Sequence, residues 1–176
     1  MSAPKFSADQ VEEIVDSSYD DLGVYVRDTE LAMELSAKYQ PGLILREKGL
    51  TYASYRVGGP TANHRFAIFS NHMFQYPDPE NYGLVVASEN SKFKVIGRHD
   101  NDKVHWIILL HLLDDDYWRV FLDLDVPFDS ELVKNCVDWL KIKSQNPVIP
   151  ELSRTEWLTL CQKPLGLDER GQFYPL

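Results

Sequence analysis

The chain of 176 residues has no long hydrophobic run. Its longest uncharged apolar stretch, residues 104–113, is about ten residues long, whereas a membrane-spanning helix needs roughly 20. Residues 1–13 carry polar and charged side chains where a secretory signal has its apolar core. We therefore expect a cytoplasmic protein with no membrane partner.

The sequence also lacks the short motifs that carry chemistry. Cys136 and Cys161 have neither the spacing of a disulfide framework nor that of a zinc site, and both fall on predicted apolar helix faces. The five histidines form no H-E-x-x-H pattern. Gly58 and Gly59 are followed by proline and lack the lysine and spacing of a phosphate-binding loop. The sequence predicts no catalytic residue, no metal and no cofactor.

The charge is negative and unevenly distributed. The net charge is −9, and residues 1–34 supply −7 of it with nine acidic and two basic residues. A field of this sign repels phosphate backbones, so we expect no nucleic-acid partner. The acidic residues of the first predicted helix are candidates for binding a protein with a basic patch; the alternative is a solvated helix face. These candidates are Asp9, Glu12, Glu13 and Asp16.

Helical punctuation marks the N-terminal region. Ser7 and Gln10 have the spacing of a capping box, which predicts a first helix ending near residues 16–19. A second helix is predicted over residues 29–39, with Asp28 as its cap and Pro41 just beyond its end.

The hydrophobic period then changes from 3.6 toward 2, which is typical of strands. The run 104–113 is apolar on both faces, as in a central strand that is covered on both sides, with a buried helix over 107–113 as the competing interpretation. An acidic turn and a second strand follow it, so residues 103–127 should be the spine of the fold. The predicted strands are 51–57, 64–70, 84–87, 92–97, 104–113 and 117–125.

The C-terminal third returns to a helical period. One helix is predicted after the cap residue Asp129, another after the capping box of Ser153 and Glu156, and residues 164–176 have no period. Helices at both ends of a run of short-linked strands predict a single α+β domain with a mainly antiparallel sheet of five or six strands. Its segments are an acidic helical part (1–40), the sheet (43–126), C-terminal helices (127–163) and a tail (164–176).

Aromatic side chains outside the periodic segments suggest an interaction surface. Phe74, Tyr76 and Tyr82 are the candidates. The loop of residues 72–77 concentrates bulky side chains, and it either folds back over the core or meets a partner. The first hypothesis is a non-catalytic intracellular protein that binds another protein, as an assembly factor, inhibitor or immunity-type partner. A homo-oligomer is left open.

The alternative hypothesis is a small-molecule-binding protein or small enzyme with its site in a concave sheet face. Its polar candidates are His64, Arg65, His105 and Arg119. His105 and His111 are six positions apart and share one strand face, but the roughly 20 Å between them is too far for one shared ion. Each should lie near one end of its strand.

Overall fold

The structure, a computed structural model, describes residues 7, 9–10, 13, 21–100, 103–113 and 131–176. These residues form an α+β fold with strands β1 (Gly23–Thr29), β2 (Ile44–Arg46), β3 (Thr51–Ser54), β4 (His64–Ser70), β5 (Phe74–Gln75), β6 (Leu84–Ala87), β7 (Lys92–Asp100) and β8 (His105–His111). The helices are α2 (Met33–Ser36), α3 (Glu131–Ser144) and α4 (Thr155–Leu160), with a 3-10 turn η2 (Pro150–Ser153) before α4. Within the described chain, no helix is both long enough and apolar enough to span a membrane.

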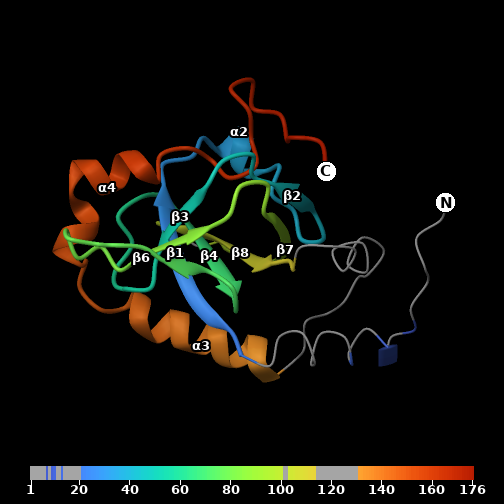
Figure 1. Cartoon of the computed structure of the whole chain (residues 1–176), viewed down its shortest axis with the longest axis horizontal. Coiled ribbons are helices and arrows are strands. Elements are labelled where there is room, and N and C mark those ends of the chain that lie inside the picture. The colour runs from blue at the N-terminus through green and yellow to red at the C-terminus, as the bar shows by residue number, and fades with distance from the viewer. Residues whose placement is uncertain (1–6, 8, 11–12, 14–20, 101–102, 114–130) are drawn as a thin grey trace.

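The strands form one mixed sheet, which corrects the predicted five- or six-stranded antiparallel sheet. Eight strands lie in the order β2-β7-β8-β4-β1-β3-β6-β5 (Figure 1). The neighbours β4 and β8 are parallel, with His64 opposite His105, while β1 is antiparallel to both β4 and β3. Most of the first predicted helix lies outside the described residues, and the second, predicted over 29–39, is reduced to the single turn α2. Residues 23–29 form a central strand instead.

Several strands lie where the hydrophobic period predicted them. The predictions for β4 and β6 are confirmed at both ends, and β8 occupies most of the run 104–113 as a strand, which rules out the competing helix. β7 begins as predicted and continues to Asp100. The predicted strand 117–125, and with it the second half of the spine, lies outside the described residues.

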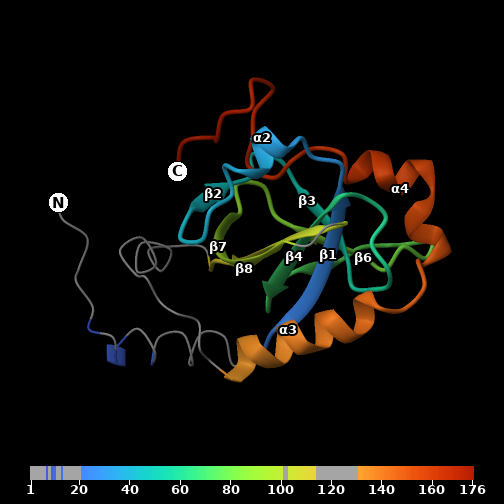
Figure 2. The ribbon, with the colours of Figure 1, turned by 180° about the vertical axis from the view of Figure 1, so that it is seen from behind.

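The sheet separates two apolar layers. Figures 1 and 2 place α3 along one side of the sheet, and α2 with the last residues of the chain along the other. Strand alternation divides the core between them. Ala67, Phe69 and Ile108 pack with α3, whereas Phe66 and Ile107 pack on the opposite side.

The C-terminal segment, residues 161–174, is packed against this second layer. Leu165 and Leu167 are buried in it, and the Phe173 ring meets the Tyr39 ring edge-on at 5.4 Å. Two polar side chains also donate hydrogen bonds to its backbone. Arg27 of β1 donates to the Lys163 carbonyl at 2.6 Å, and the Tyr39 hydroxyl donates to the Leu165 carbonyl at 2.5 Å. The segment therefore forms one wall of the core.

The two predicted capping boxes have different outcomes. At the first, the Gln10 amide donates to Ser7 Oγ at 3.2 Å and the Ser7 amide donates to Gln10 Oε1 at 2.9 Å, as predicted. The second is wrong. The Ser153 hydroxyl donates to the Pro150 carbonyl within η2, and α4 begins after Arg154 without a side-chain cap.

Candidate active site at one end of the sheet

Polar residues gather at the end of the sheet where β4 and β8 begin. Because these strands are parallel, their first residues, His64 and His105, lie side by side. The antiparallel neighbours β1 and β7 end at the same place, so Thr29 pairs with His64 and Asp100 pairs with His105. The sheet topology thus brings together residues that are far apart in the sequence.

Asp100 and His105 form a hydrogen-bonded pair at this end. His105 Nδ1 lies 2.7 Å from Asp100 Oδ1, and a carboxylate only accepts, so Nδ1 carries the proton. The same oxygen accepts from Arg98 Nη2 at 2.9 Å. The hydrogen bond from Arg98, followed by that from His105, holds the pKa of Asp100 below its ordinary value. The His105 side chain is 21% exposed, and its Nε2 bonds to none of the described residues.

His64 lies beneath this pair and is closed to solvent. Its ring stacks on that of His105 with centroids 4.9 Å apart. Burial, together with His105 and Arg98, lowers the pKa of His64 to about 4, so its imidazole is neutral at pH 7.

Ser36, His64 and Asn63 have the geometry of a catalytic triad, but their burial assigns them a structural role. His64 Nε2 lies 2.7 Å from Ser36 Oγ, and His64 Nδ1 lies 2.8 Å from Asn63 Oδ1. Ser36 Oγ also accepts from Arg98 Nη2 at 2.9 Å. Both Ser36 and His64 are fully buried, so no substrate reaches the hydroxyl in this structure. We interpret this network as the anchor of α2 on the sheet.

This network predicts a loss of stability in mild acid. Because the pKa of His64 is about 4 in the folded chain and about 6.5 in the unfolded chain, the unfolded state takes up the proton first as the pH falls. Urea unfolding should therefore show His64 contributing about 2–3 kcal/mol less stability at pH 4.5 than at pH 7. His64→Gln should have a smaller pH-dependent loss than the wild type. Equal losses in the two proteins would contradict the prediction.

A hollow of about 540 Å³ lies at the same end, on the α3 side of the sheet. Lys103, Val104 and Trp106 contribute to it, while His105 between them faces the other side by strand alternation. The hollow is lined by Pro60, Lys103, Val104, Trp106, Lys141, Ser144 and Gln145.

Arg65 of β4 contacts both Ser144, which lines this hollow, and Asp28 of the neighbouring strand β1. Its guanidinium makes a two-point contact with Asp28, with Nε 2.7 Å from Oδ1 and Nη2 2.9 Å from Oδ2. Nη1 donates to the Gly58 carbonyl at 2.7 Å and to Ser144 Oγ at 2.9 Å. Asp28 was expected to cap a helix, but it is the buried counter-ion of Arg65 instead.

The residues predicted for a pocket are separated by the sheet. The structure brings His64 and His105 together on one side and places Arg65 on the other. Arg119 lies outside the described residues. Sequence reasoning missed Asp100, which it treated as part of a turn, and Lys141 and Ser144, which sit among other polar residues of a helix. Among the described residues, no group of three or more His, Cys, Asp or Glu side chains is placed to hold a metal ion.

The predicted partner-binding residues are spread over the molecule. Phe74 and Tyr76 are exposed, whereas Tyr82 is buried with its ring 5.0 Å from that of Trp157. Asp9 and Glu13 are exposed, and Glu12 and Asp16 lie outside the described residues.

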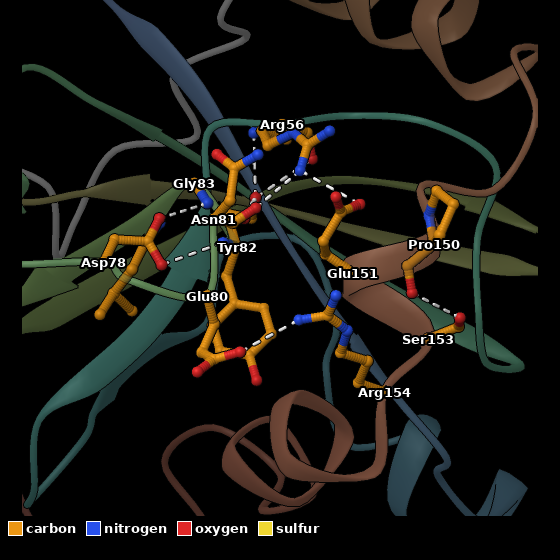
Figure 3. Close-up of polar contacts among 12 residues, drawn as sticks. Arg56, Asp78, Glu80, Asn81, Tyr82, Gly83, Pro150, Glu151, Ser153 and Arg154 are labelled. Atoms are coloured by element: carbon orange, nitrogen blue, oxygen red, sulfur yellow. Dashed lines mark hydrogen bonds and ion pairs between the residues drawn. The ribbon is translucent and has the colours of Figure 1, made fainter.

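Figure 3 shows how the loop carrying Tyr82 is held. Asp78 accepts from the Gly83 amide, and Arg56 contacts Glu151 of η2 at 3.3 Å. The segment around Tyr82 is therefore held against Leu152 and Trp157. The basic protein partner and the cytoplasmic location stay predictions.

Comparison with known proteins gives distant structural likenesses only. No family model and no curated protein matches this chain. The type III effector XopAI from Xanthomonas axonopodis pv. citri matches with a TM-score of 0.47 and 13% identity over 55% of this chain and 44% of its own. Vis, an ADP-ribosyltransferase from Vibrio splendidus, matches with a TM-score of 0.41 and 18% identity over 62% of this chain and 60% of its own. Exoenzyme S from Pseudomonas aeruginosa, in complex with human 14-3-3 protein beta and bound to carba-NAD, matches with a TM-score of 0.44 and 13% identity over 67% of this chain and 66% of its own.

This comparison contradicts the prediction of a non-catalytic binding protein, because the matched structures include ADP-ribosyltransferases. The chain spans less than half of the XopAI structure. Since these TM-scores lie below 0.5, the activities of the matched proteins are not carried over to this chain.

Proposed function

We propose that this chain is an enzyme in which the Asp100–His105 pair performs general acid–base catalysis on a small molecule. The observation that carries the proposal is the 2.7 Å contact between Asp100 Oδ1 and His105 Nδ1. The His105 side chain is 21% exposed, so solvent reaches it.

The tautomer of His105 suits a general base. With the proton on Nδ1 directed at Asp100, the lone pair of Nε2 is available to take a proton from a substrate. Arg98 keeps the carboxylate of Asp100 ionised, and that negative charge stabilises the imidazolium formed when His105 accepts the proton.

The substrate of the pair has to reach His105 from solvent, to which this side chain is 21% exposed. The hollow of about 540 Å³ lies at the same end of the sheet but on the opposite face, because Val104 and Trp106 line it while His105 between them points the other way.

The test compares turnover of many small molecules at once. Wild-type protein and His105→Ala are incubated with a metabolite extract supplemented with NAD⁺, so that a conversion that consumes this nucleotide is detected as well. Mass spectrometry should find at least one metabolite that the wild type converts about 10²–10⁴ times faster than the variant.

His99→Ala is the matched control. His99 is an exposed histidine on the same strand as Asp100, and the structure gives it a ring contact with Trp106 but no carboxylate partner among the described residues. This variant should retain turnover. If no metabolite separates the wild type from His105→Ala, the proposal is wrong.

A further inference from the structure

We infer that the hollow on the α3 side binds the anionic group of a ligand that also carries an apolar ring, and that Arg65 positions the hydroxyl that recognises this group. The inference goes beyond the proposed function, because the hollow lies on the opposite face of the sheet from His105. The binding itself stands on the geometry of the hollow.

The direction of the Ser144 hydroxyl is the first argument. A guanidinium only donates, so Ser144 Oγ must accept the hydrogen bond from Arg65 Nη1 at 2.9 Å. The hydroxyl proton then points away from Arg65, and it is donated to none of the described residues. Because Ser144 lines the hollow, it offers a donor to whatever binds there.

The charges around the hollow favour the same kind of ligand. Lys103 and Lys141 line it, and none of the lining residues that the structure describes carries a carboxylate, although the chain as a whole has a net charge of −9. The Lys141 ammonium group and the Ser144 hydroxyl proton are both suited to anionic oxygen, as in a phosphate or a carboxylate.

The remaining surface of the hollow is apolar. Pro60, Val104 and Trp106 contribute rings and methyl groups next to the lysines. This arrangement suits a ligand with a flat apolar part joined to an anionic group, because the ring can pack on the apolar residues while the anionic group meets Lys141 and Ser144.

Arg65 is held rigidly enough to act as a positioning residue. Besides its two contacts with Arg65, the Asp28 carboxylate accepts from the Thr61 amide at 2.9 Å and from the Thr61 hydroxyl at 3.1 Å. These bonds fix the loop that carries Pro60. At Gly58 in the same loop, an added Cβ would lie 2.6 Å from the Pro147 carbonyl oxygen, so the loop is pressed against the chain that follows α3.

The test measures the binding of four probes, AMP, adenosine, inorganic phosphate and benzoate, by titration calorimetry at low and at physiological salt. AMP should bind, adenosine should bind at least about tenfold more weakly, and salt should weaken AMP binding. Benzoate separates carboxylate from phosphate recognition: binding by either anion with a ring supports the inference. If neither AMP nor benzoate saturates the protein, the inference is wrong.

Two matched pairs of variants locate the site. Ser144→Ala should weaken binding of the anionic probe about tenfold, whereas Ser153→Ala, which removes an exposed serine elsewhere, should not change it. Lys141→Ala should weaken binding, whereas Lys143→Ala on the same helix should not, because Lys143 lies over the Trp139 ring and not in the hollow. Equal affinities within both pairs would place the site elsewhere.

The role of Arg65 is tested through Ser144. In an Arg65→Lys background, Ser144→Ala should cause little further loss, because the hydroxyl is no longer oriented. A full additional loss would contradict positioning by Arg65. If Arg65→Lys does not fold, the Ser144 and Lys141 variants still decide the ligand class.

The control His105→Ala should bind the anionic probe with unchanged affinity. Retained binding without any turnover difference would overturn the general-base role of His105 and leave the anion site standing. Turnover without anion binding would do the reverse.

Discussion

Replacing Asp28 with alanine is expected to lower the free energy of unfolding by about 3–5 kcal/mol, which makes it one of the most damaging single substitutions in the chain. The reason is the Arg65 guanidinium, which is 1% exposed and relies on Asp28 for its only ion pair among the described residues. Without the carboxylate, a full positive charge stays buried next to neutral acceptors only. Urea unfolding followed by circular dichroism measures the difference.

A surface ion pair supplies the control for this result. Glu80 and Arg154 contact each other at 3.2 Å (Figure 3), and their side chains are 60% and 46% exposed. Glu80→Ala should therefore change stability by less than about 1 kcal/mol. The double variant Asp28→Leu with Arg65→Met should be more stable than Asp28→Ala, because it removes both buried charges. A loss below about 1 kcal/mol for Asp28→Ala would mean that the pair is not buried as described.

Removing residues 165–176 is expected to abolish cooperative folding. This deletion takes Leu165 and Leu167 out of the core and leaves the Tyr39 hydroxyl without its acceptor. It also deprives the buried Glu47 carboxylate of the Gly166 amide, which lies 2.6 Å from Oε2. Each buried leucine alone contributes about 2–5 kcal/mol, which is comparable with the whole stability of an ordinary domain. A truncated protein should show no sigmoidal urea transition.

Two leucines separate this effect from a general sensitivity of the C-terminal region. Leu165 is fully buried, whereas Leu160 in α4 is 39% exposed. Leu165→Ala should lower the free energy of unfolding by about 2–5 kcal/mol and Leu160→Ala by less than about 1 kcal/mol. Similar losses at the two positions would contradict the packed role of the segment.

The parts of the fold that the sequence predicted are those whose side chains follow a simple period. β4 and β6 are short apolar runs between turn residues, and β8 is apolar on both faces because layers cover both sides of it. These properties belong to the local sequence.

β1 was not predicted because its last three residues are polar. Asp28 and Thr29 were interpreted as the cap and first residue of a helix, yet Arg27, Asp28 and Thr29 are all buried by partners from distant segments. Arg27 bonds to the C-terminal segment and Asp28 to β4. A local pattern does not reveal that a charge will find a counter-ion elsewhere in the chain.

Only part of the candidate site was predicted, because its contacts also join segments that are far apart in the sequence. Its position in the run 104–113 placed His105 near the end of its strand, but pairing it with His64 and Asp100 required the parallel register of β4 and β8 and the length of β7. The sequence carries no short-range signal for either. Ser144 of α3 is a candidate only because Arg65 of β4 orients its hydroxyl, and the two residues are far apart in the sequence.

The place of the last buried leucines has a consequence for how the protein is made. Leu165 and Leu167 complete a layer whose other members span β1 to β8. A ribosome that synthesises the chain from its N-terminus must therefore release most of it before that layer closes, and the unfinished sheet exposes apolar surface in the meantime. Newly made chains should need protection from aggregation, by a chaperone or by rapid completion, until residue 167 has left the exit tunnel.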